Sequence, residues 1–309
     1  MIRLTSVSLA ILVALGCRGE GGATGPDGYS GPPLFDRIIF TSIHPDSHYT
    51  ASAALWTMAT DGTDPRPLLG HLHWPESPSV SPDGRTVVFE DWWELFLVDA
   101  SGEGLRKVVL PAGVRATNPK WALADDWILF DYQATPSADK QLYRIRSNGS
   151  GLQRLTFPDG VSAWGGNWSP DGERIAFIRQ VYEPVHHTAI RWVVTKMLAT
   201  GDEAVVVDST AGFTGYLPSW SPDGQSLFLL DVSGNDWVIG RLELATSRYD
   251  LLGSARGNRP PTLSPDGTRL LYGTGDLWLA GADNSDPHVV LSNGRENFEA
   301  FWTPTAPTP

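Results

Sequence analysis

Histidine is the residue type in this sequence whose spacing comes nearest to a reactive site. Most of the histidines fall in three stretches, at His44 and His48, at His71 and His73, and at His186 and His187. Neutral imidazole nitrogens bind divalent metals. His44, His48, His71 and His73 could hold one divalent metal ion, which would assist a lyase or hydrolase acting on a polysaccharide. The alternative is ordinary loop composition, since loops collect polar residues and no carboxylate is obviously committed to the group.

A second candidate site combines arginines, aromatic residues, amides and carboxylates that recur near predicted inner strands. Its members are Trp74, Glu76, Arg115, Asn118, Trp164, Asn167, Tyr216, Arg256, Arg259, Arg295 and Glu299, with Trp92 and Trp93 nearby. Arginine binds carboxylates with two hydrogen bonds and stacks on aromatic rings. We interpret the set as a funnel that binds a protein, a peptide segment or an acidic glycan. The alternative is that the arginines pair with Glu76, Glu296 or Glu299 and join structural elements.

Other kinds of chemistry lack the residues that they need. The sequence has no G-x-S-x-G, H-E-x-x-H or EF-hand motif. Cys17 is the only cysteine, which excludes an internal disulfide and a cysteine-based zinc or iron–sulfur site. A net charge of −12 argues against a nucleic-acid partner, because phosphate binding needs a basic surface. We therefore expect a binding protein without a cofactor rather than an enzyme.

The N-terminus reads as an export signal. Arg3 is followed by an apolar run over residues 7–15, which is too short to cross a bilayer. The run ends at Gly16, directly before Cys17, and this arrangement resembles a bacterial lipoprotein signal, in which the cysteine carries lipid. The alternative is secretion with a free thiol. Residues 1–16 are thus a predicted signal peptide, and residues 17–34, rich in Gly and Pro, a predicted flexible tether that starts at the lipid.

The strongest pattern is a repeated Ser-Pro-Asp-Gly turn. It occurs at Ser81-Pro82-Asp83-Gly84, Ser169-Pro170-Asp171-Gly172, Ser221-Pro222-Asp223-Gly224 and Ser264-Pro265-Asp266-Gly267. The positions just before it, with two degenerate copies, are Val80, Trp121, Trp168, Trp220, Leu263 and Trp302, at intervals of 41, 47, 52, 43 and 39 residues. A period of roughly 40–50 residues in strand-rich sequence is typical of a β-propeller.

The ends of the repeat region predict how the ring closes. Residues 36–40 match the second strand of a repeat, and residues 299–302 match an inner strand with nothing after it. We predict an all-β, six-bladed propeller of four-stranded blades over residues 35–303, with a tail at 304–309. The C-terminal strand should join blade 1, which removes an exposed sheet edge. Trp121, Trp168, Trp220 and Trp302 should pack between blades.

The Trp-Ser-Pro-Asp-Gly repeat followed by an apolar strand resembles the WD-like propeller repeat of the TolB family. The same repeat occurs in prolyl oligopeptidase-type peptidases and tricorn protease, so the resemblance implies a fold more than a function. TolB itself has an extra N-terminal α/β domain, and we expect no counterpart of it here. TolB's role at the bacterial cell envelope, including binding of a partner lipoprotein, is therefore not carried over intact. We expect a lipid-anchored monomer on the periplasmic or outer-surface side, touching the membrane only through its lipid.

Overall fold

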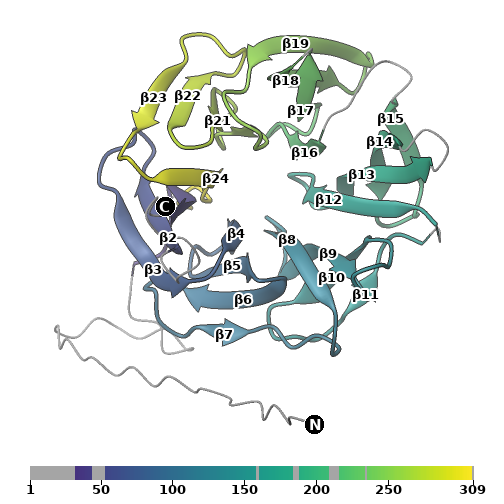
Figure 1. The fold of residues 1–309 in the computed structure, drawn as a ribbon, viewed down its shortest axis with the longest axis horizontal. Coiled ribbons are helices and arrows are strands. Elements are labelled where there is room, and N and C mark those ends of the chain that lie inside the picture. The colour runs from purple at the N-terminus through teal and green to yellow at the C-terminus, as the bar shows by residue number, and fades with distance from the viewer. Residues whose placement is uncertain are drawn as a thin grey trace, which may run out of the picture.

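The computed structural model describes residues 32–43, 53–157, 160–183, 188–208, 216–233 and 235–307. Within these ranges the regular elements are β-strands, which form six four-stranded antiparallel sheets arranged as blades around a ring (Figure 1). The predicted six-bladed propeller is therefore confirmed. The predicted signal peptide, Cys17 and most of the predicted tether lie outside the described residues. Among the described residues, no helix is long and apolar enough to cross a membrane.

Each blade runs from an inner strand at the middle of the ring to an outer strand at its circumference. Blade 1 contains, in this order, β24 (Glu296–Trp302), β1 (Arg37–Ile43), β2 (Ala53–Ala59) and β3 (Arg66–Leu72). Blade 2 contains β4 (Pro75–Val80), β5 (Thr86–Asp91), β6 (Glu94–Asp99) and β7 (Arg106–Lys107). Blade 3 contains β8 (Arg115–Trp121), β9 (Trp127–Gln133), β10 (Gln141–Arg146) and β11 (Gln153–Arg154).

The second half of the ring follows the same order. Blade 4 contains β12 (Ser162–Trp168), β13 (Arg174–Glu183), β14 (Thr188–Met197) and β15 (Glu203–Asp208). Blade 5 contains β16 (Tyr216–Trp220), β17 (Ser226–Ser233), β18 (Asp236–Glu243) and β19 (Arg248–Ser254). Blade 6 contains β20 (Thr262–Leu263), β21 (Arg269–Tyr272), β22 (Leu277–Gly281) and β23 (His288–Leu291).

The antiparallel order puts the connections on two opposite faces of the ring. The Ser-Pro-Asp-Gly turns join inner strands to second strands on one face, which we call the turn face. The connections between blades and the loops from second to third strands lie on the other, which we call the loop face. The hydrophobic core lies between neighbouring blades, where Phe40, Phe89, Phe130 and Phe177 of the second strands are fully buried.

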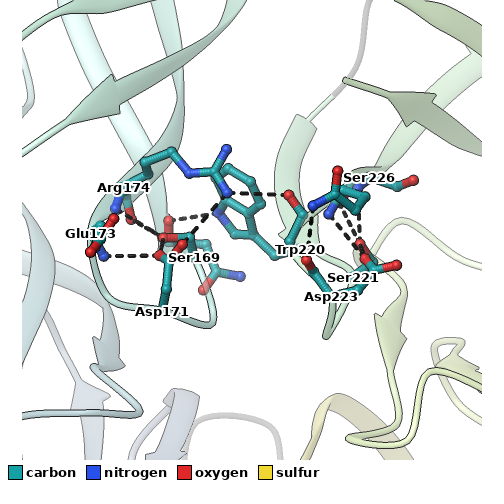
Figure 2. A network of polar contacts seen from close by, with 11 residues as sticks. Ser169, Asp171, Glu173, Arg174, Trp220, Ser221, Asp223 and Ser226 are labelled. Carbon is teal, nitrogen blue, oxygen red and sulfur yellow. Dashed lines mark hydrogen bonds and ion pairs between the residues drawn. The ribbon is translucent and has the colours of Figure 1, made fainter. Parts of the chain in front are cut away.

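Hydrogen bonds within each Ser-Pro-Asp-Gly turn explain why this motif recurs. In blade 4 the Ser169 hydroxyl donates to Asp171 and accepts the backbone N–H of Arg174 at 2.9 Å (Figure 2). Asp171 also accepts the backbone N–H of Glu173 at 3.0 Å. In the blade 6 copy, the Ser264 hydroxyl and then Thr268 lower the pKa of Asp266 to about 2. These hydrogen bonds pair the backbone polar groups of the tight turn and so stabilise it.

Tryptophans at the end of inner strands connect neighbouring blades, as predicted. The indole N–H of Trp168 donates to the carbonyl of Lys120 in blade 3 at 3.0 Å, and that of Trp220 donates to the carbonyl of Asn167 in blade 4 at 3.2 Å. Trp302 repeats the contact with the carbonyl of Thr262 at 3.2 Å. Arg174 of blade 4 covers the Trp220 ring of blade 5, as Figure 2 shows, and its guanidinium carbon lies 4.7 Å from the ring centroid.

One pair of substitutions separates the contribution of this hydrogen bond from that of burial. Trp168→Phe should lower the free energy of unfolding by about 1–2 kcal/mol, because it leaves a buried carbonyl unpaired and a small cavity. Trp121→Phe is the matched control: Trp121 is equally buried, but its indole N–H has no hydrogen-bond partner among the described residues. Urea denaturation should show a smaller loss for the control. Equal losses would contradict the role of the hydrogen bond.

The ring closes through a turn that is formed by two chain segments far apart in the sequence. β24 pairs with β1, which confirms the predicted closure, and its register places Ile38 opposite Trp302 and Ile43 opposite Glu296. Beyond β24, the Thr303 N–H donates to the carbonyl of Arg37 and the Arg37 N–H donates to the Thr303 hydroxyl, both at 2.9 Å. Ser81 and Thr86 make the same two bonds in blade 2. The closure therefore copies the Ser-Pro-Asp-Gly turn with two separate chain segments.

Candidate functional site

A β-bulge in each of five inner strands turns one residue out of the strand ladder. These residues are Ser77, Asn118, Gly165, Leu217 and Glu299, with φ between 46° and 67°. Each stands three positions before the residue that ends its inner strand. Four of them line a cavity of about 20 Å³ in the middle of the ring, which has room for one water molecule. The bulges thus surround a narrow constriction at the centre of the ring, which we call the throat. Its residues occupy the same position in each repeat, so they can be located in the sequence once the position of the bulge is known.

A charged network on the loop-face side of the throat joins three blades. Arg259, in the connection to blade 6, donates to Glu299 of blade 1 at 2.6 Å and to Glu76 of blade 2 at 2.9 Å. The Ser77 hydroxyl donates to the other Glu299 oxygen at 3.2 Å, and the Trp74 indole N–H donates to Glu76 at 2.9 Å. The structure therefore brings together Trp74, Glu76, Arg259 and Glu299 from the predicted set, in the pairing that the alternative interpretation expected.

The other three arginines of the predicted set lie on separate aromatic rings. Arg115 covers Trp93 at 4.2 Å. Arg256 covers Trp278 at 4.1 Å, and Arg295 covers Trp56 at 5.4 Å. The loop face therefore carries cation–π pairs around its circumference in addition to one ion-pair network at its centre.

The remaining members of the predicted set lie in different parts of the ring. Trp164 is half-buried and packs in the core between blades 4 and 5. Asn118 lies at the throat, within 3.3 Å of the Ser77 hydroxyl. Asn167 lies beyond the throat on the turn-face side, where its amide donates to the carbonyl of Pro218 at 3.3 Å. Tyr216 begins β16, and its side chain is outside the described part of the structure.

The histidines of the metal hypothesis are only partly within the described residues. His71 is exposed on β3, and the His73 ring nitrogen Nδ1 lies 3.2 Å from Asp91 Oδ2. His44, His48, His186 and His187 fall outside the described ranges. Within those ranges, no three His, Cys, Asp or Glu side chains lie close enough to hold a metal ion.

Three exposed tryptophans lie on the loop face, one directly before blade 2 and two in its turn between the second and third strands. Trp74, Trp92 and Trp93 expose 47%, 63% and 47% of their surface. Trp92 lies 5.3 Å from the His73 ring and 6.3 Å from Trp93, and Trp74 lies 5.9 Å from Phe298. We call Trp74, Trp92 and Trp93 the tryptophan patch. Exposed aromatic surface of this kind is typical of protein-binding sites.

The turn face carries a larger cavity of about 480 Å³, which we call the vestibule. Three sets of equivalent repeat positions build it. Its wall contains Val80, Trp121, Trp168, Trp220, Leu263 and Trp302. Its rim contains Pro82, Leu123, Pro170, Pro222, Pro265 and Pro304. Its floor, one position before the wall, contains Ser79, Lys120, Asn167, Ser219, Thr262 and Phe301. The repeat predicts the turns, whereas the cavity that its residues line is apparent only in the structure.

Two buried carboxylates, absent from the predicted set, hold the bulges of the next blade. The Asn118 backbone N–H donates to Glu90 of blade 2 at 3.2 Å, and the Gly165 N–H donates to Asp131 of blade 3 at 2.9 Å. Burial raises the pKa of Glu90 to about 8 and that of Asp131 to about 6. The sequence signal is a polar residue directly after the buried phenylalanine of a second strand, as in Phe89-Glu90 and Phe130-Asp131.

The raised pKa of Glu90 predicts a pH dependence of stability. Because the pKa rises from 4.5 to about 8, the folded protein keeps a proton that the unfolded chain releases. The stability contributed by protonated Glu90 is complete below pH 4.5 and is lost as the pH rises through 8. Glu90→Gln mimics the protonated form, so wild type should lose about 4 kcal/mol relative to this variant between pH 5 and 9. Urea denaturation across that range tests this, and parallel curves would contradict it.

Known structures share this fold at low sequence identity. TolB from Acinetobacter baumannii has a TM-score of 0.69 at 19% identity, over 86% of this chain and 66% of that protein. A putative TolB from Agrobacterium tumefaciens has a TM-score of 0.66 at 15% identity, over 87% and 93%. Oligogalacturonate lyase from Vibrio parahaemolyticus has a TM-score of 0.52 at 13% identity, over 79% and 72%. No protein-family model and no curated protein matches the sequence.

This chain has the fold of the TolB-like β-propellers. It spans just under two thirds of the Acinetobacter protein's length. At these identities the likeness concerns the fold, so activity and partners must be argued from the residues themselves.

Proposed function

We propose that this protein is a lipid-anchored component of the bacterial cell envelope that binds a protein or peptide segment on its loop face, without catalysis. The tryptophan patch carries the proposal. The resemblance to TolB-like propellers supports a binding role, and the predicted lipoprotein signal at Cys17 supports the location. The ligand would contact the tryptophan patch together with Arg115, which lies on Trp93.

The backbone at the centre of the patch strengthens this interpretation. Trp92 and Trp93 form the two-residue turn between β5 and β6, with φ of 52° and 64°. Turns of this conformation favour Asn-Gly, because a side chain at positive φ costs about 1–2 kcal/mol. Two large aromatic residues therefore occupy strained positions while remaining exposed to solvent. Such strain is found where side chains serve a ligand rather than the fold.

Exchange of the turn residues tests the proposal in a single protein. Trp92→Asn combined with Trp93→Gly should raise the free energy of unfolding by about 1–3 kcal/mol, because the strain is relieved. The backbone bond from the Ala116 N–H to the carbonyl of residue 93 is retained. Thermal denaturation should show a rise of a few degrees. A lower melting temperature would mean that the tryptophans stabilise the fold and would contradict a binding role.

The same variant tests binding. Wild-type protein, the Asn-Gly variant and a Val205→Asn control are used as bait in an envelope extract; Val205 is an exposed apolar residue on the outer strand β15. We expect wild type and the control to retain at least one protein from the extract. The amount of this protein recovered on the Asn-Gly variant should be at least tenfold lower. Equal recovery on all three baits would move the binding site away from the tryptophan patch.

The anchor needs its own experiment. Cys17→Ala should shift the protein from the membrane fraction to the soluble fraction, whereas unchanged fractionation would contradict lipidation.

The metal-assisted polysaccharide lyase or hydrolase remains the second candidate. Structural likeness to oligogalacturonate lyases, one of them in complex with manganese, favours it. It requires His44 and His48 to join His71 and His73 around a metal ion. Metal analysis of the purified protein decides: one equivalent of metal, lost in His71→Ala plus His73→Ala, would support it, and no retained metal would exclude this site.

A further inference from the structure

The vestibule on the turn face contains one charged residue, and that residue has no hydrogen-bond partner. Of the six floor residues, five are neutral and the sixth is Lys120 on β8. Lys120 lines both the vestibule and the smaller throat cavity. Its Nζ atom is buried and makes no hydrogen bond within the described part of the chain. The ammonium lies instead on the Phe301 ring, 3.7 Å from the ring centroid.

The carboxylates nearest to Lys120 are bound by other donors. Glu299 accepts hydrogen bonds from Arg259 and Ser77, Glu90 accepts the backbone N–H of Asn118, and Asp131 accepts that of Gly165. Burial lowers the pKa of Lys120 to about 8, although Glu299 and Asp131, and Glu90 once it is ionised, favour its charged form. The amine is therefore still mainly protonated near pH 7. A buried cation without a hydrogen-bonding partner is costly, and an incoming acceptor would offset that cost.

The walls limit the kind of molecule that carries this acceptor. Above the floor the vestibule is lined by tryptophan, leucine, valine and proline side chains, and its volume of about 480 Å³ is within the range of small-molecule sites. The five prolines and one leucine at the rim give it a rigid, apolar opening. A ligand that fits both parts has a compact apolar body and one anionic group at its end.

We propose that the vestibule binds a small apolar carboxylic acid, whose carboxylate accepts hydrogen bonds from Lys120 at the floor while its apolar body contacts the tryptophan wall. The flexible lysine chain would move its ammonium from the Phe301 ring to the carboxylate, and Ser79, Ser219 and Thr262 offer further hydroxyl donors on the same floor. This site is on the opposite face from the tryptophan patch and does not depend on the function proposed there.

Titration calorimetry with octanoate tests the proposal, with octylamine as a probe of equal length and opposite charge. The full protein should bind octanoate with one site and octylamine at least tenfold more weakly. Lys120→Met should weaken octanoate binding at least tenfold, whereas Lys107→Met should leave it unchanged, because Lys107 lies on the outer strand β7. If octanoate and octylamine bind equally, or octanoate does not bind, the proposal is wrong.

A second pair of variants makes the result independent of how well Lys120→Met folds. Ser79 neighbours Lys120 on the floor, and its hydroxyl accepts the backbone N–H of Trp121 at 2.9 Å. Asp and Asn both keep an acceptor there, but only Asp gives Lys120 an internal carboxylate. Ser79→Asp should therefore abolish octanoate binding while Ser79→Asn retains it within about threefold. Retention in both variants would show that Lys120 does not hold the carboxylate and would overturn the proposal.

Discussion

A chain that stops after Gly294 is expected to lose its cooperative thermal transition and to aggregate. The deletion removes β24, so β1 has no inner neighbour and exposes a row of unpaired backbone groups at the centre of the ring. It also removes Trp302, which contacts the carbonyl of Thr262, and Thr303, which completes the closing turn on Arg37. The expected loss exceeds that of any single substitution in the ring. Circular dichroism on heating and light scattering measure it.

A circular permutant is the control for this deletion. Residues 295–307 are moved in front of Pro32 through a flexible linker, which supplies the same strand from the other end of the chain. Because Thr303 and Arg37 are already hydrogen-bonded neighbours, the permutant should keep the melting temperature of wild type within a few degrees. A truncated protein that melts like wild type would disprove the shared blade.

Arg259→Met is expected to lower the free energy of unfolding by about 3–5 kcal/mol, because it leaves buried Glu299 without its cation. Arg259 connects blade 6 to Glu299 of blade 1 and Glu76 of blade 2. The substitution therefore weakens the ring where its closure already lacks a covalent connection. Urea denaturation gives the size of the loss.

Arg256→Met is the matched control for Arg259→Met. Arg256 lies in the same connection, but it is exposed and rests on Trp278, so its removal should cost less than about 1 kcal/mol. Adding Glu299→Gln to Arg259→Met should recover part of the loss, since the unpaired charge is then removed. Equal effects of Arg256→Met and Arg259→Met would show that the network does not stabilise the ring.

The fold could be predicted from the sequence because one motif defines both a local turn and a period. Ser169, Asp171 and Gly172 specify the reversal by themselves, and the distance between copies sets the blade size. The unmatched ends, residues 36–40 and 299–302, indicated the closure because a ring leaves no strand without a partner. Tryptophans next to the motif were correctly expected between blades.

Side-chain partners across the ring could not be predicted in the same way. Arg259 meets Glu76 and Glu299 only because the inner strands bulge, and the bulge residues Ser77 and Asn118 show no common residue type. Lys120 could not be identified for a related reason. Its neighbours in the sequence are Pro119 and Trp121, and only a comparison of the six floor positions shows that it is the charged one among them. Pairing depends on the ring geometry, which local sequence does not encode.

The place where the described chain enters the ring has a consequence for the proposed lipid anchor. The described chain begins on the turn face, where the Leu34 N–H donates to the carbonyl of Gly84 at 2.7 Å. A lipid on Cys17 would be connected to this face through residues 17–31, which can span at most about 50 Å. The attachment would then lie on the same face as the vestibule, and the tryptophan patch on the opposite face. The small-molecule site at Lys120 and the protein-binding site at Trp92 and Trp93 would thus lie on the anchored and the free face of one ring.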